Sequence, residues 1–215
     1  MSSPIVIADD HPLMRGALRQ AVIKVAPDAA VEDVDTLGAA RDMIARSGAS
    51  LLLLDLHMDD SDGFAGLIGL RQDYPAIPII VVSASDDDWV VRRAIQFGAS
   101  GFISKSSSMA DMGDAFEAVM AGDLAFPEID EDACATAAED EAVQQIGTLT
   151  PAQLRVLMGL AEGKLNKQIA FEMGISEATV KAHVTAVFRK LDVFNRTQAV
   201  IKAKALIVSE AQVAD

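Results

Sequence analysis

The chain has 215 residues, 51% of them hydrophobic and 23% charged, which excludes wholesale disorder and suits one large or two ordinary domains. No apolar run approaches the ~18 residues of a membrane span, so we expect a soluble, cytoplasmic protein without a membrane partner. The net charge of −14 is unevenly distributed along the chain. Residues 1–147 carry 9 Lys and Arg against 26 Asp and Glu, whereas residues 148–208 carry 9 Lys and Arg against 4 Asp and Glu. Only the second segment is therefore suited to bind a polyanion.

Short apolar runs alternate with amphipathic stretches over residues 1–122. The expected strands are 5–8, 51–54, 79–82 and 101–104, with a weaker one at 30–34. The expected helices are 13–25, 37–46, 64–73, 89–97 and 109–120. Strands that are apolar throughout and are separated by crossover helices predict a five-stranded parallel sheet, doubly wound in the flavodoxin-like α/β manner.

Polar side chains directly follow four of these strands. Asp9 and Asp10 follow the first, Asp55 the third, Ser83 the fourth and Lys105 the fifth. In a parallel sheet these ends meet at one edge, where ligands bind. Clustered carboxylates without His or Cys partners suit Mg²⁺, and a carboxylate can accept a phosphoryl group as a nucleophile. The ordinary alternatives are Asp caps of a helix and a plain ion pair between Asp55 and Lys105.

These motifs together resemble the receiver domain of two-component response regulators. The resemblance covers residues 1–122 and implies that Asp55 accepts phosphate from a cognate histidine kinase, with Ser83 and Lys105 assisting. It also implies that the protein is not an enzyme beyond slow self-dephosphorylation. An aspartyl-phosphate phosphatase or transferase is a weaker alternative, because such enzymes commonly need a second carboxylate where this chain has His57.

The same resemblance assigns a metal site and a switch. The implied Mg²⁺ ligands are Asp9, Asp10, Asp55 and the main-chain carbonyl of His57. Ser83 and Phe102 would form the switch pair that relays phosphorylation, although an aromatic residue in a strand is usually part of the core. Asp59 stands where the family usually has proline, and Ser106 replaces the common proline after the lysine, so metal affinity or phosphoryl lifetime is expected to be unusual.

Residues 123–147 are rich in acidic residues and alanine and contain no cation. We expect an acidic linker, helical in part because the alanine-rich segment 133–145 has good helix formers. Cys134, the only cysteine, cannot form an internal disulfide and is interpreted as a bystander.

Residues 148–215 predict a small all-α domain. The expected helices are 151–162, 167–173, 177–191 and 198–208. Thr150 before Pro151, Asn166, and Ser176 after Gly174 are the expected helix caps and turn. The third helix exposes a small, cationic face that suits the major groove of DNA.

Residues 149–203 resemble the LuxR-type helix-turn-helix domain, through runs such as Thr179-Val180-Lys181-Ala182-His183-Val184. With the receiver, the chain is identified as a member of the NarL/FixJ class of response regulators. The class implies that bases are read by Lys181, Ala182 and Thr185. It implies backbone contacts from Thr179, Lys164, Lys167, His183 and Lys190. For the charges alone, a three- or four-helix bundle with solvated cations is the better interpretation.

These features predict a phosphorylation-dependent transcriptional regulator. Phosphorylation of Asp55 would release the helix-turn-helix to bind double-stranded DNA, with homodimerisation because one such domain contacts only a half-site. RNA polymerase is a further candidate partner. The alternative is a DNA-binding regulator independent of phosphorylation, or a protein-interaction adaptor.

Overall fold

The computed structural model describes residues 3–129 and 137–206. Their contacts divide them into two compact units, one on each side of the gap between these ranges. The part of the expected linker at 130–136, with Cys134, and the chain end at 207–215 lie outside the described residues. Within the described ranges, no helix is long and apolar enough to cross a membrane.

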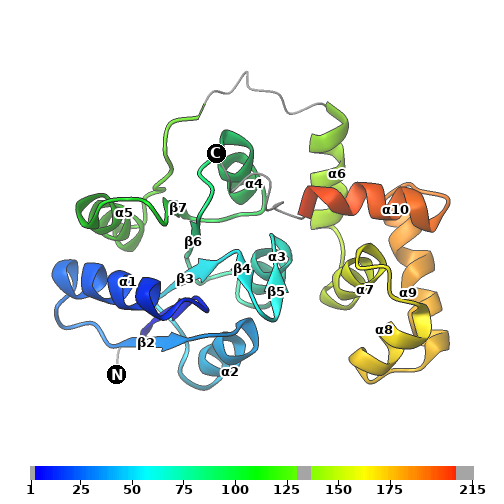
Figure 1. The fold of residues 1–215 in the computed structure, drawn as a ribbon, viewed down its shortest axis with the longest axis horizontal. Coiled ribbons are helices and arrows are strands. Elements are labelled where there is room, and N and C mark those ends of the chain that lie inside the picture. The colour runs from blue at the N-terminus through cyan, green and yellow to red at the C-terminus, as the bar shows by residue number, and fades with distance from the viewer. Residues whose placement is uncertain (1–2, 130–136, 207–215) are drawn as a thin grey trace. The chain divides into compact units, whose positions relative to one another are not determined.

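The first unit has the predicted parallel sheet, with strand order β2-β1-β3-β6-β7 (Figure 1). Its strands are β1 (Ile5–Ala8), β2 (Val31–Val34), β3 (Leu51–Asp55), β6 (Ile79–Ser83) and β7 (Gly101–Ser104). The crossover helices are α1 (Pro12–Val25), α2 (Leu37–Ser47), α3 (Ala65–Asp73), α4 (Asp88–Gln96) and α5 (Met109–Ala121). The doubly wound α/β prediction is confirmed.

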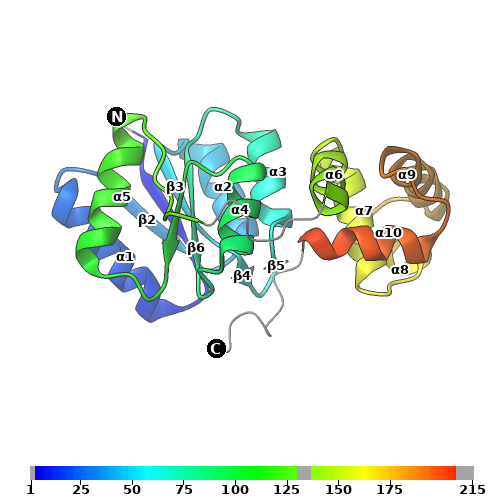
Figure 2. The ribbon, with the colours of Figure 1, turned by 90° about the horizontal axis from the view of Figure 1, so that it is seen from above.

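Both faces of the sheet are buried, as the uninterrupted apolar strands require. Figure 2 shows α1 and α5 on one face and α2, α3 and α4 on the other. Alternate strand residues therefore enter two cores: Ile7 and Leu53 pack with Phe116 of α5, whereas the residues between them point to the opposite face. The strands' carboxyl ends are thus held in fixed register, which positions the polar residues that follow them.

Two features of the first unit depart from the predicted elements. A short antiparallel hairpin, β4 (His57–Met58) and β5 (Ser61–Asp62), follows β3. Residues after α5, expected to belong to the linker, lie along β7: Ala125 forms a parallel bridge with Gly101, and the backbone N–H of Phe102 donates to the Ala125 carbonyl at 2.8 Å. A Cβ on Gly101 would lie 2.9 Å from that carbonyl oxygen, so the close approach requires glycine.

The second unit is all-α, as predicted. Its helices are α6 (Ala137–Gly147), α7 (Pro151–Ala161), α8 (Asn166–Met173), α9 (Glu177–Lys190) and α10 (Arg196–Ala203), followed by a 3₁₀ turn (Lys204–Leu206). Asn166 was expected to cap α8 but is its first residue, because Leu165 has the extended N-cap conformation. The last helix was expected at 198–208 but begins at Arg196 and ends at Ala203, because the side chain of Asn195 caps its start.

Helix α6 belongs to the core of the second unit. Its Val143 and Ile146 are buried, and the helix contacts α10. A second cluster, with Val156 of α7 and Val180 of α9 among its buried members, fixes α9 against α7 and α8. Helix α6, which forms the end of the acidic segment 123–147, therefore belongs to the same unit as α9.

Candidate functional site

A buried charged cluster lies at the carboxyl end of the sheet. Because β1 and β3 pair in register, with Ala8 opposite Leu54, Asp9 and Asp55 stand side by side. Both are nearly inaccessible, at 0% and 2% exposed. Lys105 reaches them from the end of β7: its Nζ lies 2.7 Å from Asp55 Oδ2 and 3.0 Å from Asp9 Oδ2. One cation therefore faces two buried carboxylates.

Asp10 and His11 complete the cluster at the start of α1. His11 Nδ1 lies 2.5 Å from Asp10 Oδ1 and 3.9 Å from Asp55 Oδ2. One ligand atom from each of Asp9, Asp10, His11 and Asp55 falls within 4.8 Å of all the others. His11 was not among the predicted site residues, although it directly follows the acidic pair in the sequence.

The environment of the cluster changes the proton affinity of two groups. Burial raises the pKa of the Asp55 carboxyl, and this effect exceeds the lowering by the hydrogen bond and charge of Lys105. Burial alone would lower the pKa of Lys105. The hydrogen bond to Asp55 and the negative charges of Asp55 and Asp9 outweigh this effect of burial, so the pKa of Lys105 is raised. Lys105 is therefore held as a cation, whereas the buried position of Asp55 favours binding of a proton or of further positive charge.

The donor set fits a hard cation. Two buried carboxylate oxygens, Asp9 Oδ2 and Asp10 Oδ1, lie in ion-pair contact with Lys105 and His11 but accept no hydrogen bond of good geometry. Carboxylate oxygens are the ligands that Mg²⁺ prefers, and a divalent ion would neutralise the excess negative charge. His57 lies next to this set, since its backbone N–H donates to Asp55 Oδ1 at 3.1 Å.

Ser83 and Phe102 lie on the neighbouring strands β6 and β7. Ser83 is fully buried, its Oγ accepts from the backbone N–H of Ser85 at 3.2 Å, and its carbonyl accepts from the N–H of Lys105 at 2.7 Å. Ser83 pairs with Ser104 and Val81 with Phe102, so Ser83 and Phe102 share one face of the sheet.

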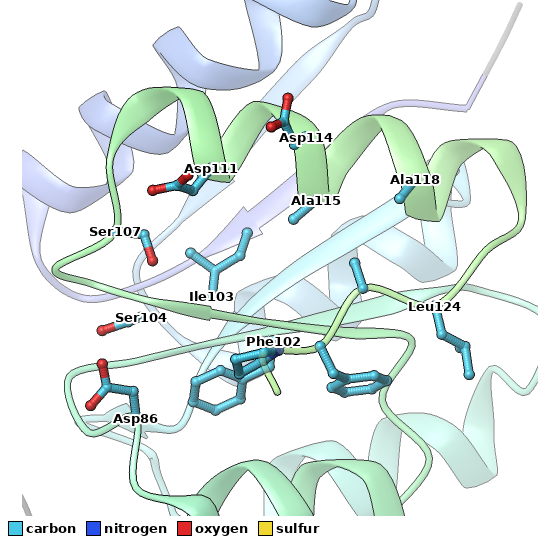
Figure 3. Close-up of a pocket in the computed structure, with 13 residues that line it drawn as sticks. Asp86, Phe102, Ile103, Ser104, Ser107, Asp111, Asp114, Ala115, Ala118 and Leu124 are labelled. Atoms are coloured by element: carbon cyan, nitrogen blue, oxygen red, sulfur yellow. The ribbon is translucent and has the colours of Figure 1, made fainter. Parts of the chain in front are cut away.

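Phe102 is buried but borders free volume. Its ring lines a cavity of about 440 Å³ between β7, α5 and the segment that lies along β7, where Leu124 lies on another wall (Figure 3). Asp86, Asp111 and Asp114 line its polar side (Figure 3). An aromatic side chain next to such a space has room to change its rotamer.

The second unit presents α9 as an accessible surface. Thr179, Lys181, Ala182, Thr185 and Arg189 are exposed, as are Glu177 and Ala178 in its first turn, whereas His183 and Lys190 are half-buried. Val180 and Val187 are fully buried on the opposite side. Short side chains on the outer face allow close approach to a duplex.

Several cations of this unit also bond within the chain. Lys181 Nζ lies 3.0 Å from Glu177 Oε1, and Lys190 Nζ donates to the Thr148 carbonyl at 2.6 Å. Hydrogen bonds to Glu162 and Glu172 raise the pKa of Lys164. The other expected backbone contact, Lys167, is exposed.

Comparisons with known proteins agree with this geometry. A family model of the response regulator receiver domain matches residues 5–117, and one of bacterial regulatory proteins of the luxR family matches residues 147–203. The chain is 41% identical over 207 residues to the glycerol metabolism activator of Pseudomonas putida, covering 93% of this chain and 94% of that protein. It is 35% identical over 202 residues to the nitrate/nitrite response regulator protein NarP of Escherichia coli (strain K12), covering 92% of each.

Solved structures share the fold. RcsB from Salmonella enterica serovar Typhimurium, bound to promoter rprA in the presence of phosphomimetic BeF₃⁻, has a TM-score of 0.55 at 22% identity and covers 95% of this chain and 99% of that one. The isolated REC domain of the same protein with BeF₃⁻ has a TM-score of 0.54 at 22% identity, over 60% of this chain and 95% of that one.

Proposed function

This chain belongs to the NarL/FixJ class of two-component response regulators, and we propose that phosphorylation of Asp55 controls its binding to DNA. The observation that carries the proposal is the buried cluster in which Lys105 Nζ contacts both Asp55 and Asp9. Paired carboxylates with one permanent cation are suited to receive a phosphoryl group, because the cation can bind the oxygens that the group brings.

The proposed chemistry is phosphoryl transfer from a histidine kinase. An oxygen of Asp55 attacks phosphorus, the bond from phosphorus to the histidine nitrogen breaks, and an acyl phosphate forms on Asp55. Lys105, now 2.7 Å from Asp55 Oδ2, would bind a phosphoryl oxygen. The Ser83 hydroxyl, at the end of the next strand, would donate to another.

The residues that would hold Mg²⁺ are Asp9, Asp10, Asp55 and the main-chain carbonyl of His57. When bound, Mg²⁺ supplies positive charge for the phosphoryl oxygens and keeps Asp55 ionised. The raised pKa of Asp55 supports this assignment, since burial disfavours the carboxylate on its own.

The proposed output is sequence-specific binding of double-stranded DNA by α9. Lys181, Ala182 and Thr185 would contact base edges, because all three are exposed on one side of this helix. The residues proposed to contact the DNA backbone are Thr179, Lys164, Lys167, His183 and Lys190. When Ser83 turns to the phosphoryl oxygen, Phe102 would move into the space that it vacates, which would alter the surface around β7.

We also propose the partners that this function requires. A homodimer would span two half-sites of an operator. RNA polymerase is the proposed target of the DNA-bound protein. Because the proposed operator is chromosomal DNA, we propose that the protein works in the cytoplasm.

The test uses the full chain with Mg²⁺ and acetyl phosphate. We expect an acid-stable, alkali-labile phosphate on Asp55 and tighter binding to selected genomic fragments, both lost in Asp55→Asn. Lys181→Ala should weaken DNA binding, whereas Lys204→Ala, which removes an equal charge from an exposed position outside α9, should have a smaller effect. An Asp55→Asn protein that still responds to acetyl phosphate would refute the proposal.

A further inference from the structure

The hairpin that follows Asp55 is fastened to a distant helix by one carboxylate. Asp60 Oδ1 accepts from the backbone N–H of Leu37, and Asp60 Oδ2 accepts from that of Gly38, both at 2.8 Å. These are the first two N–H groups of α2, which have no partner within the helix. Thr36 Oγ1 accepts from the N–H of Ala39, the third one. Asp60 therefore completes the cap of α2 from 22 residues away.

This contact also suits the charges. The first turn of α2 contains no acidic residue of its own. The Asp60 carboxylate provides the negative charge that stabilises a helix N-terminus, and its two hydrogen bonds are charge-assisted. The contact is therefore a specific clamp on the hairpin.

The hairpin needs such support. It has only two residue pairs, His57 with Asp62 and Met58 with Ser61, so Asp59 and Asp60 form its two-residue turn. Two-residue turns that match the twist of a hairpin require a positive φ, but among the described residues other than glycine only Asp192 has one. A two-pair hairpin with an unfavourable turn has little stability of its own.

A tight contact holds the hairpin from its other side. A Cβ on Gly66, in the first turn of α3, would lie 2.8 Å from Ser61 Oγ and 3.3 Å from Leu37 Cδ2. The hairpin, the start of α2 and the start of α3 therefore meet at Gly66, where an added Cβ would have to displace the Ser61 side chain. Two of these elements, the hairpin and α2, are the ones that Asp60 joins through hydrogen bonds.

We propose that Asp60 is a positioning residue for the metal site, which it serves by clamping the hairpin that carries His57 to the N-terminus of α2. The inference rests on the proposed function, because His57 is proposed to offer its main-chain carbonyl to Mg²⁺. The backbone of His57 already touches the site, since its N–H donates to Asp55 Oδ1 at 3.1 Å. Releasing the turn, three residues further on, lets that backbone move, so the metal would lose a pre-placed ligand while Asp55 and Lys105 stay in place.

The matched control is Asp59. It is the neighbouring residue of the same turn and is exposed like Asp60, so Asp59→Ala removes an equal charge from the adjacent position. Any effect of Asp60→Ala beyond that of Asp59→Ala reports the clamp and not the charge. Gly66→Ala crowds Ser61 of the same hairpin without changing a carboxylate and gives a second, independent perturbation of the hairpin.

Two titrations of the full chain with Mg²⁺ test the proposal. The first follows the fluorescence of Trp89, the only tryptophan, whose ring centroid lies 6.1 Å from that of Phe64 just after the hairpin. The second follows phosphorylation of Asp55 by acetyl phosphate. For Asp60→Ala we expect a three- to tenfold rise in the half-saturating Mg²⁺ concentration, with the phosphorylation rate at saturating Mg²⁺ within twofold of that of the unmodified chain.

Gly66→Ala should give the same pattern, whereas Asp59→Ala, which removes only the charge, should change the half-saturating concentration less than Asp60→Ala does. Amide exchange at Leu37 and Gly38 should accelerate in Asp60→Ala and not in Asp59→Ala. Equal Mg²⁺ responses of Asp59→Ala and Asp60→Ala would overturn the inference, as would a loss of rate at saturating Mg²⁺ with an unchanged midpoint. If the unmodified chain binds Mg²⁺ but is never phosphorylated, the proposed function fails, and the fluorescence midpoints still decide the role of Asp60.

Discussion

Replacing Lys202 with methionine should loosen the end of α9. Lys202 Nζ donates to the Leu191 carbonyl at 2.6 Å and to Gln145 Oε1 of α6. The Leu191 carbonyl belongs to the last turn of α9, where carbonyls lack a donor within the helix and a cation is favoured. Methionine keeps the length and apolar stem of lysine but cannot donate, so the change removes the two hydrogen bonds and little of the packing.

The size of the effect follows from these contacts. A hydrogen bond to a charged group contributes about 1.5–3 kcal/mol net, and the side chain is partly buried, so screening by water is incomplete. A change of about 1.4 kcal/mol in free energy is a tenfold change in an equilibrium constant. Losing about 1.5–3 kcal/mol therefore raises the equilibrium constant for local opening of this helix end roughly 10- to 150-fold. The change should be confined to the second unit, because both acceptors lie within it.

Amide hydrogen exchange measures this directly. Protection should fall by that factor at the N–H groups of Leu191 and Val193, which bond back to α9, and should be unchanged in α5 of the other unit. Lys204→Met, an equal charge change at an exposed neighbouring position, is the control. DNA affinity should fall more in Lys202→Met than in Lys204→Met. Equal exchange in both variants would show that the bonds to Leu191 and Gln145 contribute nothing to the order of α9.

Three further predictions concern stability. Burial raises the pKa of Asp55, so the folded state binds a proton at this carboxyl more tightly than the unfolded state does. The resulting contribution to the free energy of unfolding is complete at low pH and is lost as the pH rises through the raised pKa. Asp55→Asn should therefore raise the Tm of the metal-free protein at neutral pH, and this gain should shrink on acidification. Adding Mg²⁺ at 100 times its Kd should stabilise the unmodified chain by about 2.7 kcal/mol in urea titrations but not Asp9→Asn. Gly159→Ala should destabilise the second unit by about 1–3 kcal/mol in calorimetry, because its Cβ would lie 2.8 Å from Ile169 Cγ1.

The sheet and the place of its polar edge could be predicted because they depend on local patterns. Leu51 to Leu54 are apolar without interruption and are all buried, which the sequence run alone indicates. Once the strands are parallel, topology requires the residues after them to lie at one edge. The same holds for α9, whose N-cap Ser176 accepts from the N–H of Thr179 at 3.1 Å.

Contacts between segments far apart in the chain left no such local pattern. The bond from Lys190 to the Thr148 carbonyl joins residues 42 positions apart, and the clamp of Asp60 on Gly38 joins residues 22 apart. Both depend on how complete elements pack, which neither periodicity nor capping signals specify. The pairing of Ala125 with Gly101 is of the same kind, since a short segment after Gly122 has the composition of a linker and forms its single bridge only because it lies beside β7.

Lysine side chains of the second unit form hydrogen bonds and ion pairs within the chain, and these contacts affect which residues would contribute to DNA affinity and which to sequence specificity. Exposed ion pairs such as Lys181 with Glu177 contribute about 0–1 kcal/mol, and phosphates can replace the carboxylate at little cost. Contacts to phosphates add affinity for any sequence and fall with salt, whereas discrimination depends on groups that meet base edges. Ala182 and Thr185 form no ion pair and stay exposed on α9, so their contribution should persist at high salt. Specificity between genomic fragments should therefore change less with ionic strength than affinity does.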